Sequence, residues 1–199
     1  MKFKAQEEWG EYEQRNNHFN IPPSDELDHT WRKLLEARNI LLTPEEVQSL
    51  GANTTDRLRT TTGHYVAVLG PYHQLHCVNI IRRLIHWDYY GPRMTKEQQE
   101  AFIWKQHHSD HCLEVLRQSI MCNAYPSFYL GEWVADSYEM ISKELRTGGK
   151  SQCVDWDSLD DWAHSRALDR DHVKLRPGPY ERKHGKDERP KSDIIRDIY

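Results

Sequence analysis

The sequence lacks a long apolar run, a strong bias of charge and a large share of apolar residues. No stretch approaches the roughly 18 consecutive apolar residues of a membrane span, and the start, MKFKAQEEWG, has no apolar signal-peptide segment. The 27 lysines and arginines face 31 aspartates and glutamates, and this net charge of −4 argues against nucleic-acid binding. With 37% hydrophobic residues among 199, we expect one compact, soluble domain whose core depends on its 7 tryptophans and 10 tyrosines.

Histidine and cysteine are what the sequence has in unusual number. It contains 12 histidines and 4 cysteines. An even number of cysteines fits either two disulfides or metal ligation, and composition alone does not choose between them. The positions of these residues in the sequence are therefore needed to distinguish disulfides from metal ligation.

Capping signals and apolar spacing predict several short elements. A helix begins at the N-cap Ser24 and runs to about residue 39, and a capping box at Thr43 opens a short helix that Gly51 ends. Residues 65–69 fit either a strand or the approach to a helix. Ser158 is the expected N-cap of a later helix.

Two long helices joined by a short turn form the centre of the predicted fold. Residues 72–90 contain no proline or glycine until Gly91-Pro92, and a capping box at Thr95 opens a second run to about residue 123. A four-residue turn between long helices requires antiparallel packing. We therefore predict a mainly α-helical fold, a compact single domain built on an antiparallel helical hairpin, with minor strand content.

Composition sets the limits of that domain. Residues 1–20 are polar and aromatic without clear periodicity, so we assign them to an N-terminal extension. The folded domain is expected over residues 21–168. Residues 169–199 are rich in charged residues, proline and glycine, and we expect a charged C-terminal tail that is extended or disordered.

The pattern His-x-x-His-Cys occurs once in each long helix. The two copies comprise His73, His76 and Cys77 in the first helix and His108, His111 and Cys112 in the second. Residues three apart lie on one face of a helix, so both imidazoles of a copy can bind one metal ion. In both helices this face is also the apolar one, which predicts partly buried histidines.

The length of the turn predicts that the two copies face one another. Counted from Arg93, the histidines lie 17 and 20 residues back and 15 and 18 residues forward. The mean offset of two residues is only about 3 Å along the helix axis. Imidazole ligands suit zinc, copper, iron and nickel, and the lack of a carboxylate on these faces disfavours the two-histidine, one-carboxylate iron site. Whether one or two ions bind stays open.

Helix geometry restricts the disulfides. Cys112 and Cys122 are ten residues apart on one helix, about 15 Å, whereas a disulfide needs Cα atoms about 4.4–6.8 Å apart. We expect a disulfide between Cys122 and Cys153. Cys77 and Cys112 are either bridged or held as thiols near the metal.

These motifs resemble the UstYa-like family of fungal oxidases, which is defined by paired His-x-x-His-Cys motifs. The resemblance covers about residues 20–168. It rests on Tyr72–Cys77 and on His108–Gln118 followed by Met121 and Cys122. Supporting matches are Pro23–Asp28, Trp31, Cys153, Asp155–Asp157 and Trp162.

The resemblance implies a metal-dependent oxidoreductase of fungal secondary-metabolite and mycotoxin biosynthesis. Such an enzyme acts on C–H bonds of a peptide or other small molecule by oxidative cyclisation, dehydrogenation, hydroxylation or halogenation, with oxygen or peroxide. One or two copper ions are the implied cofactor. The implied ligands, which are also the catalytic residues, are His73, His76, His108 and His111.

The resemblance also bears on location and assembly. The family usually carries a membrane anchor before the domain, and this sequence has no membrane segment. We expect the secretory-pathway lumen if the native protein has such an anchor and the cytoplasm otherwise. A homo-oligomer is compatible with the sequence.

Two other hypotheses stay open. One is a structural zinc site in a helical interaction protein without catalysis, and the other is a metal-free domain held by disulfides. For the enzyme, Tyr65, Tyr72 and Arg117 are candidates to line a substrate pocket, with core packing as the alternative for the two aromatic residues.

Overall fold

The structure, a computed structural model, describes residues 2–7, 18–124, 130–133, 143–146, 150–169 and 171–185. Its α-helices are α1 (Asp25–Leu34), α2 (Pro44–Ser49), α3 (Gly70–Ile85), α4 (Trp87–Tyr90), α5 (Lys96–Gln99), α6 (Gln106–Cys122), α7 (Trp156–His164) and α8 (Pro179–His184). Short 3-10 helices are η2 (Glu36–Arg38), η3 (Gly91–Arg93) and η4 (Phe102–Trp104). The strands are β1 (Phe3–Glu7), β2 (Asn39–Leu42), β3 (Tyr65–Val68), β4 (Leu130–Trp133), β5 (Lys143–Arg146) and β6 (Lys150–Val154).

Helices dominate, and the described strands pair only two by two. β1 pairs with β6, β2 with β3, and β4 with β5, each antiparallel. The mainly α-helical fold with minor strand content is therefore confirmed. None of the described helices is long and apolar enough to cross a membrane.

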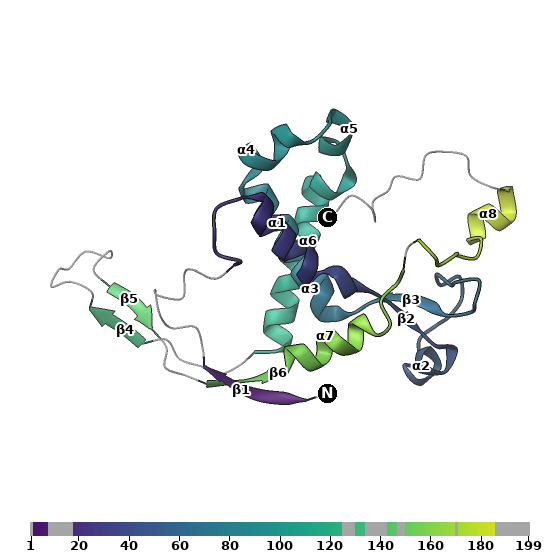
Figure 1. The fold of residues 1–199 in the computed structure, drawn as a ribbon, viewed down its shortest axis with the longest axis horizontal. Helices are drawn as coiled ribbons and strands as arrows, with labels where there is room; N and C mark the ends of the chain where they lie inside the picture. The colour runs from purple at the N-terminus through teal and green to yellow at the C-terminus, as the bar shows by residue number, and fades with distance from the viewer. Residues whose placement is uncertain are drawn as a thin grey trace.

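Helices α3 and α6 form the predicted antiparallel pair at the centre of the molecule (Figure 1). The pairing is antiparallel because His73 lies against His111 while His76 lies against His108. Beneath the histidines, a small apolar core closes the interface between the two helices. Its buried members are Cys77, Ile80, Ile103 and Cys112.

The connection between the two helices is longer than predicted. The run over 72–90 is broken at His86, which separates α3 from α4, and the run from Thr95 consists of α5, η4 and α6. The Thr95 capping box exists but opens only the short α5. Burial of Ile103 in the α3/α6 core explains the break before α6, because tertiary packing outweighs a helical preference.

The second, larger core lies where α1, η2, β2, α3 and α7 meet. Its buried members are Leu27, Trp31, Leu35, Ala37, Ile40, Tyr72 and Ala163. Ser24 caps α1 as predicted by accepting from the Leu27 amide. The helix ends at Leu34, and residues 39–42 form β2 where the prediction had helix as far as residue 39.

Of the remaining predictions of local structure, some are confirmed and one is wrong. The Thr43 capping box and the positive φ of Gly51, +63°, confirm the short α2. Residues 65–68 form strand β3. The later helix, α7, begins at Trp156 with Asp155 in the N-cap position, so the expected N-cap Ser158 is wrong.

Both ends of the sequence contain more structure than expected. Residues 3–7, within the expected extension, form β1 against β6, with Lys4 opposite Cys153. In the charged tail, Pro179–His184 forms α8, so the expectation of an extended or disordered segment is wrong there. Residues 186–199 lie outside the described residues.

Candidate metal centre

The four motif histidines meet across the α3/α6 interface. The ring centroids of His73 and His111 are 5.8 Å apart, those of His76 and His108 6.3 Å, and those of His108 and His111 6.2 Å. This confirms that the two motif copies face one another. It follows from the i, i+3 spacing, which puts both histidines of a copy on the face that meets the other helix.

Exposure changes from one side of the cluster to the other. His76 is only 6% exposed, and His73 and His108 are half-buried, whereas His111 is exposed. The site therefore has a closed inner side and an outer side that opens to solvent.

Burial favours the neutral form of three of the imidazoles. The pKa of His76 falls from 6.5 to about 3, first because of burial and then because of the nearby charge of Arg38. The pKa of His73 is also lowered, first by burial and then by the charges of His111 and Arg38. Burial lowers the pKa of His108 too, against the opposing hydrogen bond to Ile103. Neutral rings have the lone pair that metal binding needs.

Two hydrogen bonds fix opposite tautomers on the inner rings. The Nδ1 of His108 lies 3.0 Å from the Ile103 carbonyl, which can only accept, so Nδ1 carries the hydrogen and the lone pair lies on Nε2. The guanidinium of Arg38 donates to Nδ1 of His76 at 2.9 Å, so the neutral His76 ring carries its hydrogen on Nε2. His108 thus has the tautomer of an Nε2 metal ligand, and His76 does not while Arg38 is bound to it.

The donor chemistry fits a metal better than the spacing does. Two imidazoles that hold a tetrahedral ion at about 2.1 Å have ring centroids about 5 Å apart. The observed separations, from 5.8 to 6.3 Å, are wider. Accordingly, the described part of the chain contains no group of three or more His, Cys, Asp or Glu residues already placed to hold an ion. Binding would require these rings to approach by about 1 Å.

The motif cysteines lie beneath the imidazoles as thiols. Cys77 and Cys112 are completely buried, and their thiols form a hydrogen bond that lowers the pKa of Cys77 and raises that of Cys112. The Sγ of Cys112 is also 3.9 Å from Nδ1 of His108. Of the two alternatives left open, the structure has the thiols, in contact with each other and packed in the core.

The disulfide expected between Cys122 and Cys153 is not formed, because both are free thiols. Cys122 is exposed in the last turn of α6, whereas Cys153 is half-buried in β6, beside β1. The prediction followed from excluding other partners. It could not foresee that the two residues have such different surroundings.

The residues expected to line a substrate pocket are not brought together. Tyr72 is completely buried in the larger core, its ring 5.4 Å from Trp156 and its hydroxyl donating to Asp160. Tyr65 is buried in β3 beneath the guanidinium of Arg59, 4.5 Å from its ring.

Arg117 is exposed and binds Glu114 through two hydrogen bonds of 2.8 and 2.6 Å. It is therefore part of a surface ion pair on α6. For Tyr72, the alternative of core packing is the one that the structure supports.

Sequence reasoning missed Arg38 and the carbonyl of Ile103. Arg38, only 6% exposed, comes from η2, 38 residues before its partner His76. No local spacing links these two positions. The contact between a buried arginine and a motif histidine arises only when distant segments meet in the folded chain.

A family model described as "Mycotoxin biosynthesis protein UstYa" matches residues 3–166. The chain is 32% identical over 162 residues to "UstYa family oxidase phomYd" of Diaporthe leptostromiformis, covering 78% of this chain and 49% of that protein. It is 24% identical to "UstYa family oxidase aprY" of Aspergillus flavus, covering 80% and 50%. It is 25% identical to "Chlorinase cctP2" of Talaromyces islandicus, covering 72% and 42%.

The chain spans about half the length of the curated relatives it matches. No solved structure matches it.

Proposed function

Since the chain belongs to the UstYa family of mycotoxin biosynthesis proteins, we propose that it is a copper-dependent oxidase acting on C–H bonds of a peptide or other small secondary metabolite. The observation that carries the proposal is the meeting of four imidazoles from two facing helices. The names of its relatives, which include oxidases and a chlorinase, support oxidative chemistry.

In this proposal His73, His76, His108 and His111 hold the metal. Copper bound by imidazoles changes between two oxidation states, and this supplies the means to activate oxygen or peroxide. The chain itself provides an apolar base for the site, because Cys77, Ile80, Ile103 and Cys112 are buried under the rings. Such an apolar base limits the access of water to a reactive oxidant.

The exposed outer side favours catalysis over a structural zinc site. Structural zinc sites are closed by four protein ligands, whereas catalytic sites keep a position for water or substrate. His111 is exposed and His76 is buried, so substrate has an approach from the side of His111.

Metal analysis of protein made without a histidine tag tests the proposal. Metal-free chain is offered Cu(II) or Zn(II) separately, the bound metal is counted, and oxygen consumption with ascorbate is measured. We expect bound copper and copper-dependent oxygen consumption, both reduced when a motif histidine is replaced by alanine.

The matched control is His172→Ala, because this exposed histidine pairs with Asp169 away from both motifs. It should leave copper binding and oxygen consumption unchanged. Binding of zinc alone, or oxygen consumption that survives loss of the motif histidines, would contradict the proposal.

A further inference from the structure

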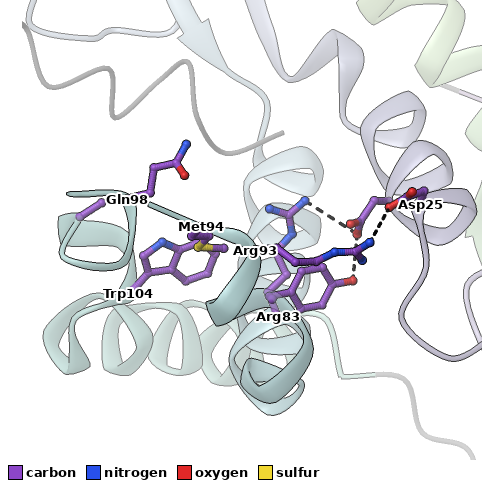
Figure 2. Close-up of a pocket in the computed structure, with 9 residues that line it drawn as sticks. Asp25, Arg83, Arg93, Met94, Gln98 and Trp104 are labelled. Carbon is purple, nitrogen blue, oxygen red and sulfur yellow. Dashed lines mark hydrogen bonds and ion pairs between the residues drawn. The ribbon is translucent and has the colours of Figure 1, made fainter. Parts of the chain in front are cut away.

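A second feature of the molecule is a pocket at the far end of α3. Its volume is 320 Å³, which is within the range of about 300–1,000 Å³ typical of small-molecule sites. Figure 2 shows two unlike walls: Arg83, Arg93 and Asp25 lie on one side, and Met94, Gln98 and Trp104 on the other. A pocket with one charged wall and one largely apolar wall suits a ligand that has a charged group at one end and an apolar group at the other.

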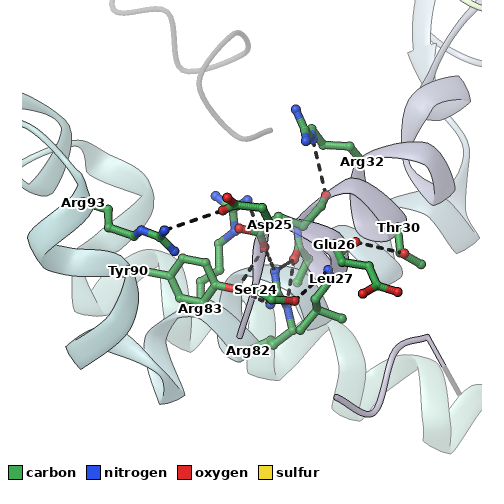
Figure 3. Close-up of polar contacts among 12 residues, drawn as sticks. Ser24, Asp25, Glu26, Leu27, Thr30, Arg32, Arg82, Arg83, Tyr90 and Arg93 are labelled. Carbon is green, nitrogen blue, oxygen red and sulfur yellow. Dashed lines mark hydrogen bonds and ion pairs between the residues drawn. The ribbon is translucent and has the colours of Figure 1, made fainter. Parts of the chain in front are cut away.

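Arg83 is the unusual member of the charged wall. It is only 8% exposed, and its nearest carboxylate oxygen, Oδ1 of Asp28, lies 3.8 Å from its Nη2. That oxygen already accepts from Arg82 at 2.7 Å and from the Tyr90 hydroxyl at 2.9 Å (Figure 3). Asp28 is therefore engaged by other donors, and Arg83 is left at a distance too great for a hydrogen bond.

The guanidinium of Arg83 consequently has unused hydrogen-bonding capacity. Its Nε is buried and has no hydrogen-bond partner among the described residues. Burial lowers the pKa of Arg83, Arg82 lowers it further, and the attraction of Asp28 only partly opposes this. Buried donors without acceptors are uncommon in folded proteins, so a guanidinium with an unsatisfied donor in the wall of a pocket is a candidate group for binding an anion.

The charges around the pocket favour an anion. Arg82 neutralises Asp28, which leaves Arg83 without a carboxylate of its own. The side chains of Arg93 and Asp25 are 51% and 90% exposed and lie 3.7 Å apart, so water screens that pair, and the Arg93 guanidinium lies over the Tyr89 ring. One buried and one exposed guanidinium can thus face a ligand together.

We propose that this pocket binds a small molecule with a carboxylate and an apolar body. The carboxylate lies against Arg83 and Arg93, because the planar guanidinium matches a carboxylate with two parallel hydrogen bonds. The apolar body lies against Trp104 and Met94 on the opposite wall. The acid is either free or the C-terminus of a short peptide, which has the same chemistry.

The position of the pocket relates it to the imidazole cluster. Arg83 follows His76 by seven residues in α3, two turns on the same helix face and about 10 Å away. Trp104 follows Ile103, whose carbonyl holds His108. The pocket therefore lies beyond the closed inner side of the cluster, apart from the open side at His111, and its ligand is proposed independently of the oxidase function.

Calorimetric titration of the metal-free full chain tests the binding. The probes are 4-phenylbutyrate, its neutral amide, and the cationic 4-phenylbutylamine. We expect the carboxylate to bind at least about 10-fold more tightly than the amide, because it forms charge-assisted hydrogen bonds, and the amine to bind worst. Equal binding of carboxylate and amide, or preference for the amine, overturns the proposal.

Variants locate the site. Arg83→Gln should remove the preference for carboxylate over amide, while Arg57→Gln, at an exposed arginine elsewhere, should preserve it. Because Arg83 is buried, the fold of this variant is checked by circular dichroism. Met94→Glu, at a half-buried position, supplies a second test, since its carboxylate should repel the probe. A preference that survives both changes overturns the proposal.

A final arm separates the two sources of the carboxylate. N-acetyl-glycyl-phenylalanine is compared with its C-terminal amide. Carboxylate-dependent binding of this dipeptide supports recognition of a peptide C-terminus, and binding of 4-phenylbutyrate alone supports a free acid. Because no metal or turnover is involved, failure of either probe leaves the oxidase proposal to its own test.

Discussion

The inner and outer halves of the imidazole cluster differ in how firmly the protein holds them. In the inner pair, Arg38 fixes Nδ1 of His76 and the Ile103 carbonyl fixes Nδ1 of His108. In the outer pair, within the described residues, His73 and His111 contact other rings but form no hydrogen bond. The difference indicates that two rings are preorganised while two can move, which a site needs if its rings must close on an ion.

Removal of one imidazole from each half should have the largest effect on the proposed copper binding. His108→Ala deletes a preorganised ring with its lone pair on Nε2, and we expect copper affinity to fall more than about 100-fold. His111→Ala deletes an exposed ring, and we expect a fall of about 10-fold. Competition titrations with a copper chelator measure both. Equal losses would mean that the two halves are equally organised.

The buried imidazole should also make the metal-free protein sensitive to acid. In the unfolded chain His76 binds a proton near pH 6.5, whereas in the folded chain its pKa is about 3. Between these values the unfolded state binds more protons, so the free energy of unfolding decreases as the pH falls. At about 1.4 kcal/mol per unit, the loss is about 5 kcal/mol over the whole window, comparable with the stability of a small domain.

Urea unfolding at pH 7.0, 6.0, 5.0 and 4.0 measures this slope. The His76→Gln variant is the comparison, because glutamine does not titrate. Its dependence on pH should be shallower by almost one proton between pH 6 and pH 4. Identical slopes would show that another group causes the acid sensitivity.

Arg38 should weaken metal binding by the inner half of the cluster. Its guanidinium holds the hydrogen of His76 on Nε2 and adds a positive charge beside the site. We expect Arg38→Met to raise the pKa of His76 toward its ordinary value and to strengthen copper binding by about 10-fold. Nuclear magnetic resonance follows the pKa, and chelator competition follows the affinity.

Arg38→Lys separates the two causes. Lysine keeps the positive charge but lacks the planar fork of the guanidinium. An affinity between those of wild type and Arg38→Met would indicate that charge and tautomer both matter. Weaker copper binding in Arg38→Met would instead make Arg38 a residue that positions His76 for the metal.

The inner and outer halves also differ in how far the sequence predicts them. The convergence of all four rings follows from the i, i+3 spacing and the length of the turn. Both ring pairs, His73 with His111 and His76 with His108, are centred on residue 92, close to the Arg93 used for the prediction. The partners of the inner rings do not follow from spacing, because Arg38 reaches His76 across 38 residues.

The same limit applies to the fold. Caps at Ser24, Thr43 and Thr95 are local signals, and the structure has all of them. The breaks at His86 and before α6 depend on tertiary packing, in particular on the burial of Ile103. Local helix propensity does not predict these breaks. The pocket beside Arg83 is likewise formed by α1 meeting the end of α3, an encounter between distant segments.

The cysteines should show the smallest effects and still separate the inner side from the surface. Cys112→Ala removes a buried sulfur beside His108 and should cost about 1 kcal/mol, whereas Cys122→Ala at an exposed position should change the free energy of unfolding by less than about 0.5 kcal/mol. Thermal unfolding with and without a reductant checks the thiols. Because all four cysteines are free, the Tm should not change when reductant is added. If reductant lowers the Tm of the wild type but not that of Cys122→Ala, a disulfide between Cys122 and Cys153 exists after all. If reductant lowers the Tm of the wild type but not that of Cys112→Ala, a disulfide between Cys77 and Cys112 lies beneath the inner imidazoles.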